Sequence, residues 1–202
     1  MKQLSKDPIN LIVSGVGGQG NVMVSLVIGN ALVKDGYFVT IGETYGASQR
    51  GGSVMSHVKI SAQSQYSPLI PEGQADIILG MEPMETLRMV KQFGNGHVET
   101  VVNPRPIQAV DLTGTGSGYP DMDALLAQIK DLSARTYIVN ATEEAQKMGD
   151  PILANMILIG ALTKTGLLPI SEAQLAEVIK QMFPKAIDIN AGALKRGMEI
   201  LQ

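Results

Sequence analysis

The sequence predicts a three-layer α/β/α domain, and two patterns carry that prediction. Up to residue 140, short apolar runs alternate with segments of helical length. Beyond residue 140, the chain has a helical pattern throughout. Strands that alternate with helices form mostly parallel sheets, covered by helices on both faces. We therefore expect a mostly parallel sheet, a helical C-terminal tail, and a single domain over residues 1–202.

The expected strands are apolar runs that end near glycine or proline. They cover residues 9–14, 37–41, 53–61, 75–80, 97–103 and 135–140. Most of these runs are typical of parallel strands buried on both faces. Residues 53–61 instead alternate loosely between apolar and polar side chains. This alternation favours an antiparallel strand with one less buried face.

The expected helices lie between and after these strands. They cover residues 21–35, 83–93, 121–132, 141–148, 151–165, 171–182 and 184–201. Pro83 suits the first turn of its helix, and Asp121 is the expected N-cap of another. Residues 152–162 are apolar on all sides of a helix, so other elements must cover them completely. Either a second subunit or the tail helices could provide that cover.

Composition excludes several classes of chemistry. The 202 residues include no cysteine and only two histidines, His57 and His97. A disulfide framework, a thiol nucleophile and an ordinary iron–sulfur cluster are therefore excluded, and a multi-histidine metal site is disfavoured. Any one-electron redox chemistry would need metal centres on another chain. A net charge of −3 argues against a nucleic-acid-binding surface.

Two further features concern the surroundings of the chain. Its first eight residues are mostly polar, and no apolar run reaches the ~18 residues that span a bilayer. We therefore expect a cytoplasmic protein without membrane contact. Charged residues make up 17% of the chain, below the usual ~25%. A well-filled core and a partner-covered surface both explain that deficit.

A glycine-rich turn follows the first expected strand and precedes the first expected helix. Gly15, Gly17 and Gly20 have the spacing of a dinucleotide-binding turn, with Gly18 and Gln19 between them. Such a Rossmann-like turn can hold a phosphate at the helix N-terminus, or simply let the helix pack closely. A nicotinamide dinucleotide would also require an acidic residue near the end of the second strand, and Glu43 is the candidate.

A second polar, glycine-rich segment covers residues 42–52, directly after the second expected strand. It contains Ser48, Gln49, Arg50, Gly51 and Gly52, which can bind anions through hydroxyl, amide, guanidinium and backbone groups. The carboxyl ends of parallel strands share one edge of a sheet, so both glycine-rich loops should border one crevice. The alternative is a plain turn with a solvated arginine.

Several segments together resemble a known family. They are Gly-Val-Gly-Gly-Gln-Gly at 15–20, Glu-Thr-Tyr-Gly-Ala-Ser-Gln-Arg-Gly-Gly-Ser-Val-Met-Ser-His-Val at 43–58, Ser-Pro-Leu-Ile-Pro-Glu-Gly-Gln-Ala-Asp at 67–76, Val-Asn-Pro-Arg-Pro-Ile at 102–107, Gly-Asp-Pro-Ile-Leu-Ala-Asn-Met at 149–156 and Phe-Pro-Lys-Ala-Ile-Asp-Ile-Asn at 183–190. This series resembles the gamma-type domain of 2-oxoacid:ferredoxin oxidoreductases, and within that family the small subunits of the indolepyruvate type. Tyr45 departs from the histidine that many of these relatives carry.

The resemblance implies a subunit of a larger enzyme. The family converts a 2-oxo acid, CoA and oxidised ferredoxin to acyl-CoA, carbon dioxide and reduced ferredoxin. It implies that a large partner subunit holds thiamine diphosphate and the iron–sulfur clusters, that ferredoxin meets the complex, and that this chain is inactive alone. A homodimer is compatible with it. By position, the implied CoA-facing residues are Gly15, Gly17, Gly18, Gln19, Gly20, Glu43, Ser48, Gln49, Arg50, Gly51 and Gly52.

Two other functions remain open from the residues themselves. One is a stand-alone Rossmann-type NAD(P) oxidoreductase, and the other is a nucleotide-binding regulatory module. His57 is expected to be a sheet-face histidine bonded to a neighbour rather than a catalytic group. Glu82 and Glu85 could form an acid–base pair, but they more simply favour the N-terminal turn of their helix. Neither Asn140 nor Asn155 is assigned to chemistry.

Overall fold

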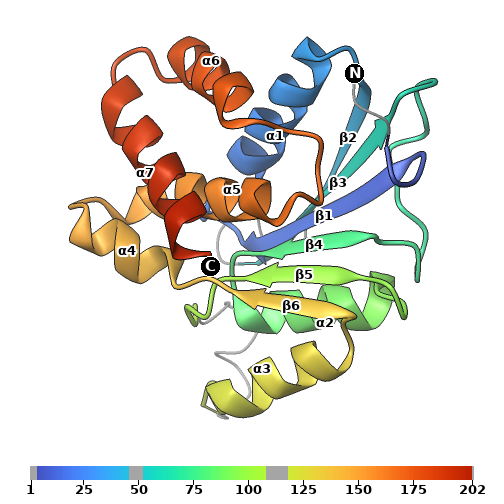
Figure 1. Cartoon of the computed structure of the whole chain (residues 1–202). Coiled ribbons are helices and arrows are strands. Elements are labelled where there is room, and N and C mark those ends of the chain that lie inside the picture. The colour runs from blue at the N-terminus through green and yellow to red at the C-terminus, as the bar shows by residue number, and fades with distance from the viewer. Residues whose placement is uncertain (1–3, 46–51, 108–117, 202) are drawn as a thin grey trace.

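The structure is a computed structural model that describes residues 4–45, 52–107 and 118–201. In these residues, six strands form one sheet in the order β2-β3-β1-β4-β5-β6 (Figure 1). The strands are β1 (Ile9–Val16), β2 (Phe38–Tyr45), β3 (Ser53–Ser61), β4 (Ile77–Gly80), β5 (Glu99–Val102) and β6 (Arg135–Ile138). The helices are α1 (Asn21–Lys34), α2 (Pro83–Phe93), α3 (Met122–Asp131), α4 (Ala141–Lys147), the 3-10 helix η2 (Pro151–Leu153), α5 (Ala154–Thr165), α6 (Glu172–Met182) and α7 (Ile187–Ile200).

Helices cover both faces of the sheet, which confirms the three-layer prediction. In Figure 1, α2 and α3 lie on one face, and α1 lies with the C-terminal helices on the other. Alternate residues of β1 point to opposite faces. Leu11 and Val13 join the core beneath α1, α5 and α6, whereas Ile12 joins the core beneath α2 and α3. A single strand therefore contributes to both hydrophobic cores.

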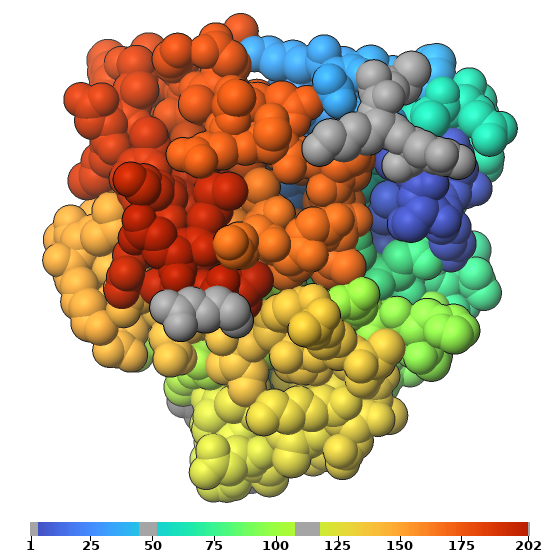
Figure 2. Space-filling model, in the orientation of Figure 1, coloured from blue at the N-terminus to red at the C-terminus, as the bar shows by residue number. Residues whose placement is uncertain are grey.

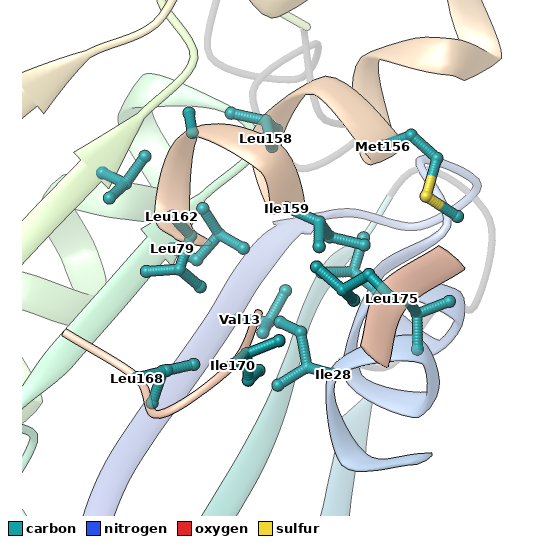
Figure 3. Close-up of a cluster of buried hydrophobic side chains, with 14 of the residues drawn as sticks. Val13, Ile28, Leu79, Met156, Leu158, Ile159, Leu162, Leu168, Ile170 and Leu175 are labelled. Carbon is teal, nitrogen blue, oxygen red and sulfur yellow. The ribbon is translucent and has the colours of Figure 1, made fainter. Parts of the chain in front are cut away.

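The apolar helix α5 is covered by the tail helices. Its residues from Ala154 to Leu162 are buried, and α7 makes the most extensive helix–helix contact with it. Figure 3 shows Ile159 and Leu162 of α5 facing Val13 and Ile28, from β1 and α1. Among the alternatives the sequence left open, cover by the tail helices is the one the fold provides.

Strand β3 is antiparallel to both of its neighbours, β1 and β2. The other three pairings, β1–β4, β4–β5 and β5–β6, are parallel. The expectation of one antiparallel strand is therefore confirmed. Its position is new: β3 lies between β1 and β2, so the first two parallel strands are not neighbours.

The second strand is longer than the sequence predicts, which corrects the expected loop over residues 42–52. Residues 42–45 continue β2 through Tyr45, in register with Val54–His57 of β3. Gly42-Glu43-Thr44 has no apolar pattern that would predict a strand. The ladder with β3, which comes later in the chain, supplies the backbone hydrogen bonds that make it one.

The helix boundaries follow local signals. Asp121 is the N-cap of α3, as predicted, and accepts a hydrogen bond from the Ala124 N–H at 2.9 Å. Ser171 and Gln174 form a reciprocal capping box at the start of α6. In the part of the chain that the structure describes, no helix has the length and apolarity needed to cross a bilayer.

The topology places a crevice at one point of the sheet edge. The chain leaves β1 through α1 on one face toward β2, and it leaves β4 through α2 on the other face toward β5. These connections diverge from adjacent parallel strands. Ligands of open α/β sheets bind beyond the carboxyl ends of strands at such a switch point.

Candidate functional site

A crevice of about 450 Å³ opens at this switch point. Its walls come from segments that follow β1, β4, β5 and β6, and from the start of α5. They are Gly18, Gln19, Met81, Asn103, Arg105, Ile107, Thr142, Gln146, Pro151, Ile152, Ala154, Asn155 and Leu158. The volume is within the range of small-molecule sites, and the wall combines apolar side chains with amides, a hydroxyl and one guanidinium.

The glycine turn forms one wall of the crevice and contacts the second loop. Gly20 has a φ of +91°, the left-handed region that favours glycine, and directly precedes α1. The Gly17 N–H donates to the Gly52 carbonyl at 2.8 Å. The end of β1 and the start of β3 are thus joined, so the two glycine-rich segments do meet. This bond also means that the Gly17 N–H already has a protein partner.

Gln19 closes the turn with its own side chain. Its Oε1 accepts from the Val16 N–H at 2.6 Å, and its Nε2 donates to the Met81 carbonyl at 3.0 Å. The side chain therefore bridges the carboxyl ends of β1 and β4. The Gln19 carbonyl in turn accepts from Asn155 Nδ2 at 3.1 Å, which fixes the turn to the start of α5.

The predicted site residues divide into three groups. Gly18 and Gln19 line the crevice, with Gly15, Gly17, Gly20 and Gly52 beside them in the turn and strand ends. Glu43 lies within β2, where its carboxylate accepts from Ser56 Oγ at 2.6 Å and from Ser25 Oγ at 3.2 Å. Ser48, Gln49, Arg50 and Gly51 lie outside the described residues.

The opposite wall consists of residues that the sequence patterns do not single out. Asn103 Nδ2 donates to Thr142 Oγ1 at 2.9 Å, and the Thr142 N–H donates to Asn103 Oδ1 at 3.3 Å. This pair joins the segments after β5 and β6. Arg105 is exposed at the rim and forms no ion pair with any residue that the structure describes. Their position after expected parallel strands was the one available signal, but it does not give the order of the strands, which brings both segments to the crevice.

Glu82 supports this second wall from behind. It is the fully buried N-cap of α2 and accepts from the Glu85 N–H at 2.9 Å. It also accepts from the Tyr119 hydroxyl and from the Ile107 N–H, the latter at 3.4 Å. Burial raises the pKa of the Glu82 carboxyl, and these hydrogen bonds oppose that rise. The helix-start interpretation of Glu82 is confirmed.

His57 lies outside the crevice, on the face of β3. It is buried, its Nδ1 accepts from the Ile70 N–H at 3.2 Å, and its ring meets that of Phe93 edge-on. Burial and the nearby Lys59 lower the pKa of His57, so the imidazole is neutral at neutral pH. The prediction of a bonded sheet-face histidine is confirmed.

The described residues do not suit a metal centre. Over residues 4–45, 52–107 and 118–201, no group of three or more acidic or histidine side chains could hold an ion. The described crevice also has no carboxylate–histidine pair among its lining residues. Its amide, hydroxyl and guanidinium groups can bind and orient a ligand.

An open α/β sheet with a ligand-sized crevice at its switch point is the arrangement of the class of α/β proteins that bind ligands beyond the carboxyl ends of their strands. Residues 10–200 match the model of the pyruvate ferredoxin/flavodoxin oxidoreductase family, and the chain belongs to that family. This confirms the resemblance drawn from the motifs. The chain is a subunit of a 2-oxoacid ferredoxin oxidoreductase.

Two relatives show how closely the chain follows indolepyruvate-type subunits. It is 37% identical over 190 residues to indolepyruvate oxidoreductase subunit IorB of Archaeoglobus fulgidus, covering 94% of this chain and 93% of the relative. It is 36% identical over 192 residues to IorB of Thermococcus kodakarensis, covering 94% of each.

Solved structures share the fold. The gamma subunit of a keto/oxoacid ferredoxin oxidoreductase from Geobacter sulfurreducens aligns with a TM-score of 0.68 and 22% identity, covering 96% of this chain and 98% of that one. The 2-oxoglutarate:ferredoxin oxidoreductase from Magnetococcus marinus aligns with a TM-score of 0.75 and 22% identity. It covers 98% of this chain but only 31% of that longer chain.

Proposed function

We propose that this chain is the small subunit of an indolepyruvate-type 2-oxoacid ferredoxin oxidoreductase and that its crevice forms the CoA-facing part of a shared active site. The complex would convert a 2-oxo acid and CoA to acyl-CoA and carbon dioxide while it reduces ferredoxin. The crevice at the switch point, lined by Arg105 and by amide side chains, is the observation that carries the CoA assignment. The identity to IorB subunits supports the substrate type.

The chemical groups are divided between two chains in this proposal. Iron–sulfur clusters need thiolate ligands, and this chain has no cysteine, so a larger subunit holds them together with thiamine diphosphate. This chain supplies binding groups to CoA. The described crevice contains no evident acid–base pair, which fits a subunit that is inactive alone.

The crevice suits parts of CoA for separate physical reasons. The Arg105 guanidinium can make paired hydrogen bonds with a phosphate, and it is not engaged in an ion pair with the described residues. Gln146 and Thr142 add polar groups to the same wall, and Ile152 and Leu158 offer apolar surface to the uncharged portion of the ligand. With 450 Å³ available, the crevice accommodates a part of CoA rather than all of it.

An Arg105→Gln substitution tests this assignment in the complex reconstituted with its larger subunit. Loss of one charged phosphate contact should raise KM for CoA about tenfold, which corresponds to about 1.4 kcal/mol. KM for the 2-oxo acid should not change. Arg135→Gln is the matched control, because Arg135 is an exposed arginine on β6 that does not line the crevice. An unchanged KM for CoA in Arg105→Gln would overturn the assignment.

The stand-alone NAD(P) enzyme is the alternative function, and two contacts count against it. The Gly17 N–H, which would face a pyrophosphate, donates to Gly52. Glu43, the candidate for the ribose hydroxyls, is bonded to Ser25 and Ser56. Titration of the complete chain with NADH and with CoA separates these functions. Tight NADH binding with turnover in the absence of a partner would reject the subunit proposal.

A further inference from the structure

The segment that carries Arg105 is fixed at its first residue. Asn103 directly follows β5 and is buried. Its N–H donates to the Gly80 carbonyl at 2.9 Å, and its Nδ2 donates to the Met81 carbonyl at 3.4 Å. Its side chain also forms the reciprocal pair with Thr142, with bonds of 2.9 and 3.3 Å. Asn103 is therefore bonded both to the turn after β4 and to the start of α4.

The segment is fixed a second time, two residues beyond Arg105. The Ile107 N–H donates to Glu82 Oε1 at 3.4 Å. Glu82 is fully buried at the N-cap of α2, where its Oε2 accepts from the Glu85 N–H at 2.9 Å. Both ends of the segment are thus bonded to residues 80–82, which connect β4 to α2.

Two prolines restrict the backbone between these anchors. Pro104 and Pro106 stand on either side of Arg105. A proline ring fixes its own φ angle and also confines the residue before it to extended conformations. We call these five residues the rim segment (Asn103–Ile107). Its backbone has little conformational freedom in the middle and hydrogen-bonded anchors at both ends.

The middle of the rim segment has little support from neighbouring side chains. Arg105 and Pro106 are exposed. The segment borders the crevice of about 450 Å³ and a second hollow of about 260 Å³, and Asn103 and Arg105 line both. In Figure 2, yellow-green atoms of this part of the chain reach the surface just below α4. The position of Arg105 therefore depends on the anchors and on the prolines.

We propose that the rim segment is a rigid support that holds Arg105 in place for the ligand, and that Glu82 and Pro106 are positioning residues of the crevice. This inference rests on the proposed function, in which Arg105 binds a phosphate of CoA. A support that is ordered before the ligand arrives lowers the entropic cost of binding. Glu82 is fully buried and is not among the described residues that line either hollow, so it acts through the segment that it bonds.

The anchor at Ile107 requires a carboxylate at position 82, because both carboxylate oxygens accept hydrogen bonds. Oε1 accepts from the Ile107 N–H and from the Tyr119 hydroxyl, and Oε2 accepts from the Glu85 N–H. A glutamine amide has only one oxygen acceptor. Glu82→Gln can therefore keep either the cap of α2 or the anchor of the rim segment, but not both.

The first test replaces Pro106 with glycine in the complex reconstituted with the larger subunit. Pro106→Gly removes an exposed ring and frees the backbone at residues 105 and 106. KM for CoA should rise about three- to tenfold, because the support must then be ordered on binding. Pro71→Gly is the matched control, an exposed proline before β4 that is not among the described residues lining either hollow. Its KM for CoA should equal that of the unmodified complex.

Combination with Arg105→Gln tests whether the positioning residues act through Arg105. Glu82→Gln and Pro106→Gly should each raise KM for CoA in the unmodified background. Neither should raise it further in a complex that already carries Arg105→Gln, because the positioned group is then gone. A substitution that merely weakens the fold would raise KM in both backgrounds. An increase of the same size in both backgrounds would therefore overturn the proposal.

The same measurements separate this inference from the proposed function. If Arg105→Gln raises KM for CoA but neither Pro106→Gly nor Glu82→Gln does, the rim segment does not position Arg105. The inference is then wrong, and the CoA assignment stands. If Arg105→Gln itself leaves KM for CoA unchanged, the CoA assignment is wrong and the positioning role fails with it.

Discussion

The two walls of the crevice use their polar groups in different ways. On the β1 side, the Gly17 N–H and the Gln19 side chain are engaged with Gly52, Val16 and Met81 of the same chain. On the β5–β6 side, Arg105 at the rim forms no ion pair with the described residues. The first wall therefore maintains the shape of the crevice. The second wall also has an internal pair, Asn103 and Thr142, but under the proposed function its Arg105 is the group that meets the ligand. A motif that resembles a binding fingerprint can thus serve mainly to build the site.

If the glycine turn on the β1 side mainly maintains the shape of the crevice, Gly20→Ala should have the largest effect on the free energy of unfolding. Its φ of +91° is costly for alanine, and the new Cβ would lie 2.5 Å from Asn155 Nδ2. Asn155 would have to move and release the Gln19 carbonyl. We expect a loss of about 2–3 kcal/mol in the free energy of unfolding, measured with urea.

The double variant Gly20→Ala/Asn155→Ala is the control for this mechanism. Removal of the Asn155 amide relieves the clash but not the left-handed backbone strain. The two substitutions should therefore cost less together than the sum of their separate effects. Strict additivity would show that Asn155 does not restrain the turn.

Gln19→Leu should have the next largest effect. Leucine has a similar size, but it removes the Gln19 acceptor of the Val16 N–H and leaves the Met81 carbonyl with only the 3.4 Å hydrogen bond from Asn103 Nδ2. We expect destabilisation by about 1–3 kcal/mol in the same urea measurement. A variant as stable as the unmodified chain would show that Gln19 is available to a ligand, and the difference between the two walls would disappear.

The sequence predicts most of the fold because the decisive signals are local. Strand 53–61 and helix 83–93 agree with β3 and α2 residue for residue, since polar or turn-forming residues bound both runs. The sequence predicts a loop at residues 42–45, because their strand character depends on pairing with β3. Such non-local pairing leaves no pattern in the segment itself.

The candidate site was predicted only in part for the same reason. Gly18 and Gln19 belong to a compact motif and were found. Asn103 and Thr142 are 39 positions apart, and Asn155 bonds Gln19 across 136 positions. Each of these residues is unremarkable in its own segment. Only the order of the strands brings the segments after β5 and β6 to the crevice.

Glu82 supports the β5–β6 wall and Gln19 the β1 wall, and substitutions of the two should differ in how their effect on stability depends on pH. This difference should be smaller than the effects above. Burial raises the pKa of Glu82, so the folded protein holds this proton more strongly than the unfolded chain does. The resulting stabilisation is present below the ordinary pKa of 4.5 and is lost as pH rises through the raised value. Relative to the unmodified chain, Glu82→Gln should therefore gain stability with rising pH. The deficit of Gln19→Leu should not change with pH, and a constant Glu82→Gln difference would contradict this account.

Arg105→Gln should have the smallest effect on folding, and that result is informative beside its expected effect on CoA. An exposed arginine without an ion pair to the described residues should contribute within about 0.5 kcal/mol to the free energy of unfolding. Thermal unfolding of the complete chain measures this directly. If Arg105→Gln instead destabilised the chain as much as Gln19→Leu, Arg105 would be a structural group. The polar groups of both walls would then have structural roles, and the ligand-binding groups would lie elsewhere on the chain or on its partner.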